Sequence, residues 1–200
     1  MTGAIEILRR DHDEMRRLLA VVETSLPAAA GSVAGAGSVA GAGAGDGRLA
    51  ALVEQVIIDE SGHEAIEEQY FWPLVRRRVH DGARLADQAI SQEQEAKHVL
   101  ARLERHDSRD AGYGALIRRF LVVGRAHIDF EETRVWPGVR LALSEQELDD
   151  LGDQLEQGKR LAPTRPHPNM PPTAEVLKVV APIAAATDWI RDVLGGRRSR

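Results

Sequence analysis

The 200-residue chain is long enough for one domain with a sizeable core, and its 43% hydrophobic and 28% charged residues are typical of a soluble globular protein. The net charge of −5 argues against nucleic-acid binding, and the absence of cysteine excludes disulfides, thiolate zinc sites and cysteine-ligated iron–sulfur clusters. The N-terminal residues lack the apolar core of a signal peptide, and no run of about 18 apolar residues occurs. We therefore expect a cytoplasmic protein without a membrane span.

Helical periodicity predominates in the first half of the chain, and no segment alternates as a β-strand would. A first helix is predicted from about Thr2 to Ser25. Its apolar stripe consists of Ile5, Leu8, His12, Met15, Leu19 and Val22. Residues 28–47 are rich in Gly and Ala and contain a direct repeat of GSVAGA. Because this stretch has few side chains to bury, we expect a flexible surface insertion there. A second helix is predicted over residues 48–79. Its inward stripe consists of Leu52, Val56, Glu60, His63, Glu67, Tyr70 and Leu74.

Two more long helices are predicted in the middle of the chain. A turn at residues 80–82 precedes a third helix over residues 83–106. A second turn at residues 107–114 precedes a fourth helix over residues 115–143. Long helices joined by short turns pack as antiparallel neighbours.

The C-terminal quarter differs from the preceding segments in composition. Ser144 and Glu147 form a capping-box pattern, so a short helix is predicted from Ser144 to about Gln157. The Pro-rich segment 162–172 should be extended, and a last amphipathic helix is predicted over residues 173–194.

The predicted fold class is therefore all-α: an up-down-up-down four-helix bundle with additional C-terminal helices. The bundle is assigned to residues 1–143, and residues 144–200 are assigned to a C-terminal helical extension with a Pro-rich tail.

The second and fourth predicted helices carry the same motif, H-x-x-x-E-E-x-x-x-W-P. It runs from His63 to Pro73 and again from His127 to Pro137, an offset of 64 residues. The first and third helices supply single histidines, at position 12 and at His98. The histidine spacings are 51 and 29 residues, and the first becomes 31 when the 20-residue insertion is subtracted. The chain therefore resembles two copies of a helical hairpin.

Residues four apart lie on one face of a helix, so His63 and Glu67 project together, as do His127 and Glu131. Buried carboxylates are costly without a partner, and no lysine lies on the inward stripes as we assign them. A pair of metal ions bridged by the two glutamates would provide the compensating charge. Imidazole and carboxylate ligands without sulfur favour non-haem iron or manganese over structural zinc. Glu64 could complete the coordination.

Two alternatives remain open at this point. Glu60–His63 and Glu95–His98 both match the Glu-x-x-His pattern of ferritin-like di-iron bundles. That pattern also needs lone glutamates on the other two helices, where histidines stand, so we prefer the His-x-x-x-Glu register and place Glu95 among the outer groups. Tyr70, one turn after the first glutamate, either packs in the core or donates a hydrogen bond to a ligand.

On these residues the sequence resembles the hemerythrin family, specifically the bacterial hemerythrin-like HHE cation-binding proteins. The match covers about residues 4–143. It rests on His12, on His63 with Glu67, on His98, and on His127 with Glu131. The resemblance implies a di-iron centre, bridged by oxo or hydroxo groups and carboxylates, that reacts with oxygen, peroxide or nitric oxide.

The sequence departs from the oxygen-carrying members of that family on the third helix. Those members present H-x-x-x-H there, whereas this chain reads His98-V-L-A-Arg102. The resemblance implies that Glu64 fills the gap, as a glutamate does in some iron-sensing relatives. Added carboxylate favours redox turnover over reversible oxygen binding. The expected function is catalase- or peroxidase-like removal of peroxide or nitric oxide. The alternative is a non-enzymatic O₂ or iron sensor. In each case the partner is a small molecule rather than nucleic acid or a membrane.

Overall fold

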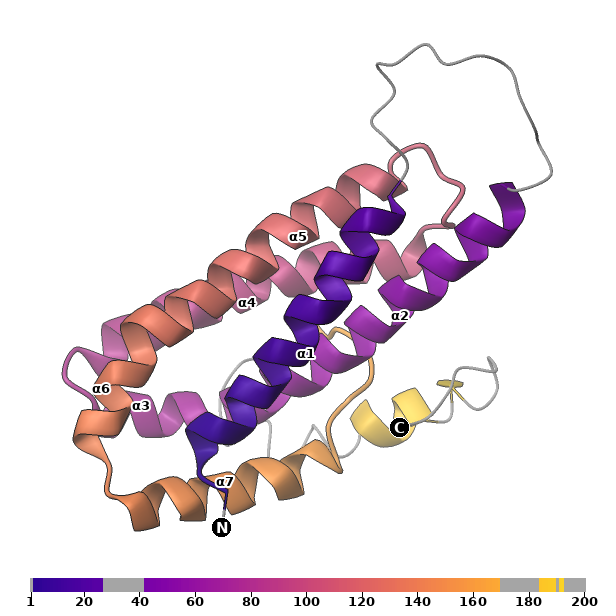
Figure 1. Cartoon of the computed structure of the whole chain (residues 1–200). Coiled ribbons are helices and arrows are strands. Elements are labelled where there is room, and N and C mark those ends of the chain that lie inside the picture. Colours follow the sequence, from indigo (N-terminus) through magenta and orange to yellow (C-terminus); the bar gives the residue numbers. More distant parts are fainter. Residues whose placement is uncertain (1, 27–41, 170–183, 190, 193–200) are drawn as a thin grey trace.

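Four long helices lie side by side and form the body of the molecule (Figure 1). The computed structural model describes residues 2–26, 42–169, 184–189 and 191–192, and the side chains of residues 42–46 are excepted. The long helices are α1 (Ala4–Ser25), α2 (Ala42–Ile66), α4 (Gly82–Arg105) and α5 (Tyr113–Phe130). Helices α1 and α4 each pack against both α2 and α5, and successive long helices run in alternating directions (Figure 1). The chain therefore has the predicted all-α bundle.

Each copy of the repeated motif contains a π-helical turn, Glu67–Phe71 in the first and Glu131–Val135 in the second. The backbone N–H of Trp72 donates to the carbonyl of Glu67, five residues back, and Trp136 does the same to Glu131. A proline follows each tryptophan. Because proline has no N–H and its ring clashes with the carbonyl four residues earlier, an ordinary α-turn is disfavoured there. The wider turn lets the helix continue.

Short helices α3 (Trp72–Arg78) and α6 (Trp136–Ala142) follow the two π-turns. The extra residue of a π-turn rotates everything after it around the helix axis. Phe71 and Val75 are therefore fully buried, whereas the stripe drawn at a constant 3.6-residue period had assigned Tyr70 and Leu74, which are only half-buried.

Helix α7 (Glu145–Lys159) crosses one end of the bundle and packs on α1 and α2 (Figure 1). Its predicted capping box is confirmed: the Glu147 N–H donates to Ser144 Oγ at 3.3 Å, and the Ser144 N–H donates to the Glu147 carboxylate at 2.9 Å. Of the last predicted helix, residues 184–189 and 191–192 are described and helical, and the remainder lies outside the described residues.

The core consists of two apolar clusters separated by a polar layer. One cluster surrounds Phe71, Trp72 and Trp136, near α7, and the other surrounds Phe120 and Ile117, toward the opposite end. In α1 the change from one cluster to the other falls between Leu8 and Met15, and every residue of the predicted stripe is buried: Ile5, Leu8, His12, Met15, Leu19 and Val22. The histidines predicted as ligands on α1, α2 and α5 lie in the polar layer.

For the helices predicted before residue 160, the boundaries agree with the structure to within about two residues except at α2. This helix begins at Ala42, so residues 42–47 are helical although the sequence assigned them to the flexible insertion. The rest of the predicted insertion that follows Leu26 lies outside the described residues. No helix of the described ranges is long and apolar enough to cross a membrane.

The docking of α7 on α1 leaves no room for a side chain at Gly152. A Cβ atom there would lie 2.4 Å from the carbonyl oxygen of Thr2 and 3.2 Å from the backbone nitrogen of Ala4. We expect Gly152→Ala to lower the free energy of unfolding by about 1–3 kcal/mol, the usual cost of overpacking. Gly112→Ala is the control, because no atom lies within 4 Å of its Cβ position. Equal midpoints for the two variants in urea denaturation would contradict this close approach.

Candidate metal centre

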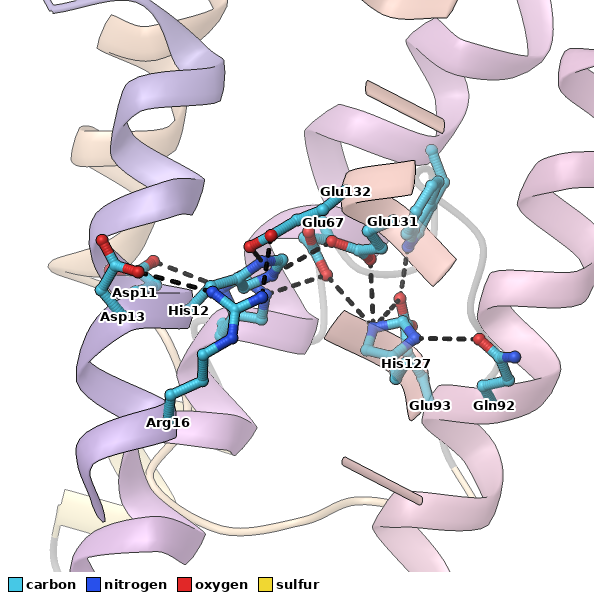
Figure 2. A network of polar contacts seen from close by, with 12 residues as sticks. Asp11, His12, Asp13, Arg16, Glu67, Gln92, Glu93, His127, Glu131 and Glu132 are labelled. Atoms are coloured by element: carbon cyan, nitrogen blue, oxygen red, sulfur yellow. Dashed lines mark hydrogen bonds and ion pairs between the residues drawn. The ribbon is translucent and has the colours of Figure 1, made fainter. Parts of the chain in front are cut away.

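Three imidazoles and two carboxylates converge in the polar layer of the bundle (Figure 2). Helix α1 supplies His12, α2 supplies His63 and α5 supplies His127, while the first residues of the two π-turns are Glu67 and Glu131. All five side chains are buried. The structure thus brings together five of the seven residues predicted as ligands.

The ligand atoms form two groups that share both glutamates. The first group is His12, His63, Glu67 and Glu131, and the second is Glu67, Glu93, His127 and Glu131. Within each group one donor atom per residue lies within 4.8 Å of all the others. Two neighbouring ions bridged by the shared carboxylates would satisfy both groups at once, which is the arrangement expected from the repeated motif.

The donor atoms that face the centre have no hydrogen-bond partner among the described residues. These atoms are Nε2 of His12, His63 and His127, and both carboxylate oxygens of Glu67 and Glu131. Some approach closely without the angles of a hydrogen bond: His12 Nε2 lies 3.2 Å from a Glu131 oxygen, and His127 Nε2 lies 3.1 Å from the other. Buried polar atoms normally find partners. A cluster of unpartnered imidazole nitrogens and carboxylate oxygens is the chemistry expected of a metal-binding site.

The opposite ring nitrogen of each histidine is held by a polar side chain. Nδ1 of His12 lies 3.0 Å from Glu132, Nδ1 of His63 lies 3.3 Å from Asp11, and Nδ1 of His127 lies 3.3 Å from Gln92. Metal-binding histidines are usually oriented in this way, because the outer hydrogen bond fixes the tautomer and leaves Nε2 free for the ion.

Basic side chains support two of these outer acceptors. Arg16 lies 2.8 Å from Glu132, and Lys159 of α7 donates to Asp11. Burial alone would raise the pKa of Asp11, but its hydrogen bond and ion pair with His63 and the charge of Lys159 outweigh this and lower the pKa to about 2. Asp11 is therefore an ionised acceptor that holds the His63 ring.

Glu93 of α4 is a candidate ligand that the sequence reasoning missed. Its side chain is fully buried. Trp72 Nε1 donates to the Glu93 oxygen that lies 4.0 Å from His127 Nε2, and the other oxygen has no hydrogen-bond partner among the described residues. A signal was present in the sequence, because Glu93 continues the buried stripe of Ala86, Ala89, Ala96 and Leu100. Its spacing of four from Lys97 is also that of an ordinary exposed ion pair, which masks this signal.

The structure does not place His98 and Glu95, both predicted to belong to the centre, in either ligand group. Both side chains are exposed on α4, and Glu95 pairs with Arg119 of α5. At 3.6 residues per turn, His98 lies about 140° around the helix from Glu93 and therefore points away from the bundle axis. The matched histidine spacing fixes the position of His98 along the chain, but it does not fix the direction in which the side chain points around the helix axis.

Glu64 is buried but lies outside both ligand groups. It faces a second cluster of ionisable groups, in which the ammonium group of Lys97 lies 2.6 Å from Glu68. Burial raises the pKa of Glu64 well above its usual range, partly offset by the charge of Lys97. The buried lysine corrects the expectation that none lies on the inward faces. It supplies positive charge beside the carboxylates but does not reach the orphaned atoms of Glu67 and Glu131.

The two tryptophans of the repeated motif contact the centre, and Tyr70 does not. Trp136 stacks on the His12 ring with centroids 4.9 Å apart and an interplanar angle of 14°, and Trp72 holds Glu93. Tyr70 instead lies against Gly158 of α7, where a Cβ atom would be 2.6 Å from its ring. Of the two roles left open for Tyr70, the structure favours packing.

Without metal, the two shared carboxylates differ in proton affinity. Burial and the charge of Glu131 raise the pKa of Glu67 well above its usual range. Burial acts in the same direction on Glu131, but the charge of His127 and the close approach of His12 outweigh it and hold the pKa of Glu131 well below normal. For His127, burial lowers the pKa, but the neighbouring Glu131 raises it more. In the absence of metal, the centre therefore holds protons at neutral pH.

A cavity of about 130 Å³ adjoins the first ligand group. Its walls come from α1, α2, α5 and the end of α7, and all three histidines of the centre line it. The lining residues are Asp11, His12, Glu14, Met15, Asp59, Glu60, His63, His127, Ile128 and Lys159. A cavity of about 150 Å³ can hold benzene, so this one has room for several waters or for a molecule of a few heavy atoms.

Fold and site together define a helical bundle with a candidate His/Glu cation-binding centre. Comparison with known proteins gives the same class. Residues 3–139 match the model of the hemerythrin HHE cation-binding domain, so the chain belongs to this family. An uncharacterized hemerythrin-like protein of Schizosaccharomyces pombe is 23% identical over 141 residues, which are 70% of each chain. A crystal structure of a hemerythrin HHE cation-binding domain-containing protein from Mycobacterium kansasii has a TM-score of 0.59 and 22% identity, covering 80% of this chain and 89% of that one.

The sharing of Glu67 predicts different metal stoichiometries for single substitutions. Glu67→Gln should weaken binding in both ligand groups, whereas Glu93→Gln should affect only the group that contains His127. His98→Ala is the matched control and should bind cations like the wild type, because His98 is exposed. Cation content after dialysis, measured by mass spectrometry, decides the outcome. Loss of metal in the His98 variant would contradict the ligand set.

Cation binding at pH 7 should release protons. Burial and the charge of Glu68 raise the pKa of Glu93 to about 8, and the pKa of His127 is also raised, so both groups carry protons in the metal-free protein. Ligands must be deprotonated to bind. Apparent affinity should therefore increase as the pH rises toward 8.

Calorimetric titration in two buffers of unlike ionisation enthalpy measures the protons released. Glu93→Gln should release about one proton fewer than the wild type, because its own site is removed. Heats that do not depend on the buffer would contradict the protonated state of the centre.

Proposed function

We propose that this chain is a non-haem di-iron protein that removes hydrogen peroxide. The observation that carries the proposal is the pair of ligand groups sharing Glu67 and Glu131, with donor atoms that have no other partner among the described residues. Three imidazoles, three carboxylates and no sulfur suit iron among the metals with accessible redox states. Two adjacent iron ions would supply a two-electron couple, which is what disproportionation of peroxide to water and dioxygen requires.

The protein's own residues hold and shield such a centre. Glu132, Asp11 and Gln92 orient the imidazoles, and Trp136 covers the His12 ring. The apolar clusters on either side of the polar layer exclude bulk water. Preorganised ligands of this kind need no rearrangement to bind the ions.

The adjacent cavity favours a small reactant. Its volume of about 130 Å³ admits peroxide, nitric oxide or dioxygen and lies below the range of about 300–1,000 Å³ that is usual for drug-sized ligands. With Glu93 in place of an additional imidazole, the centre is rich in carboxylate. Such ligands stabilise the higher oxidation state and so favour turnover over reversible oxygen binding.

A second candidate function is non-enzymatic sensing of iron or oxygen. The connection from Lys159 through Asp11 to His63 favours it, because it joins α7 directly to the centre. A sensor would change the docking of α7 on loading and would leave peroxide unconsumed.

The test is peroxide consumption by iron-loaded protein. Apoprotein is loaded with Fe²⁺ without oxygen and freed of excess metal, and dioxygen release is followed with an electrode after peroxide is added. We expect two irons per chain and one dioxygen for every two peroxides. Glu67→Gln should lose activity by at least about tenfold, since disturbing metal coordination or its supporting groups commonly costs 10–100-fold.

His98→Ala again serves as the matched control and should keep full activity. Two bound irons with decay no faster than with free iron would contradict the peroxide reaction while leaving the di-iron centre intact. Rapid consumption of nitric oxide, without consumption of peroxide, would show that nitric oxide is the substrate of the same centre.

A further inference from the structure

The cavity beside the centre is lined by more negative charge than a neutral substrate needs. Four carboxylates line it, Asp11 and Glu14 from α1 and Asp59 and Glu60 from α2. Peroxide, nitric oxide and dioxygen are uncharged and gain little from such walls. None of the four belongs to either ligand group. The proposed reaction therefore does not explain why four carboxylates line the cavity.

The carboxylates form a graded path from solvent to the ligands. The Glu14 side chain is 54% exposed and that of Asp11 is 23% exposed. Asp59 is half-buried, and Glu60 is only 3% exposed. Carboxylates in a cleft with low-dielectric walls focus the electric field and concentrate cations within it.

The cavity is also lined by the three histidines of the candidate metal centre, His12, His63 and His127. Nε2 of each histidine is buried without a hydrogen-bond partner in the described part of the chain. The acidic path thus ends at the residues that carry unpartnered metal-ligand atoms.

We propose that this cavity is the route by which divalent cations enter the metal centre, and that Asp59 and Glu60 capture them on the way. The inference rests on the proposed metal centre and adds its point of entry. Oxygen ligands on the path suit a hydrated divalent ion, which exchanges waters for carboxylates before it reaches the imidazoles. The volume of the cavity leaves space for an ion that keeps part of its water.

Lys159 opposes this attraction at the outer end. It is the one lysine or arginine among the described residues that line the cavity, and it pairs with Asp11. Lys159 lies on α7, beyond residue 139 where the family match ends. The extension therefore reduces the negative potential of the entrance and slows cation entry.

The experiment measures the rate of cobalt loading. Metal-free protein is mixed with Co²⁺ in a stopped-flow instrument, and the visible absorption of bound cobalt is followed at low ionic strength. Asp59→Asn combined with Glu60→Gln should slow loading about tenfold, in the range by which charged clefts alter association rates. The final cobalt content should not change. The difference should shrink in high salt, because salt screens the field.

Two further variants separate entry from general charge effects. Asp153→Asn removes one negative charge from an exposed position on α7 outside the cavity lining and should load at the wild-type rate. Lys159→Gln should load about threefold faster. Asp59→Asn alone keeps the comparison available if the double variant is unstable, because Asp59 is only half-buried.

The outcomes distinguish the route from the centre. A wild-type chain that binds no cobalt overturns the metal centre and the route with it. Full final loading of the Asp59/Glu60 variant at an unchanged rate overturns the entry route alone, and so does equal slowing by Asp153→Asn.

Discussion

The burial of two carboxylates at the centre of the bundle is the constraint on which the rest of the structure depends. Glu67 and Glu131 are fully buried, and their oxygens have no hydrogen-bond partner among the described residues. Such groups are strongly destabilising unless a positive charge or a metal compensates them. The converging imidazoles, the outer acceptors that orient them and the dry apolar clusters on either side all serve this one layer.

The two Trp-Pro sequences link the backbone to this layer. A proline in mid-helix usually kinks or ends the helix. Here the π-turns absorb it, so that the tryptophans fall beside the ligands while the helices continue into α3 and α6. The backbone adjustment begins at the buried glutamates themselves. The residues that distort the helix and the residues that bind the cation are therefore parts of one motif.

The sequence was sufficient for the bundle and for the candidate ligands that the repeat encodes. His63, Glu67, His127 and Glu131 followed from helical spacing, and the apolar stripe of α1 placed the fifth ligand. Glu93 could not follow from the repeat, because its place depends on the rotation of α4 and on the indole of Trp72. The π-turns also escaped prediction, because a constant period of 3.6 residues cannot represent one inserted residue.

The unequal use of the two tryptophans makes the duplicated halves non-equivalent. Trp136 covers an imidazole that lines the cavity, whereas Trp72 anchors Glu93, which does not line it. The ligand group with His12 and His63 therefore has two imidazoles, both of which line the cavity, whereas the group with Glu93 has three carboxylates and one imidazole. The two copies of the motif thus surround an asymmetric site. The same substitution made in each copy would affect a different ligand group.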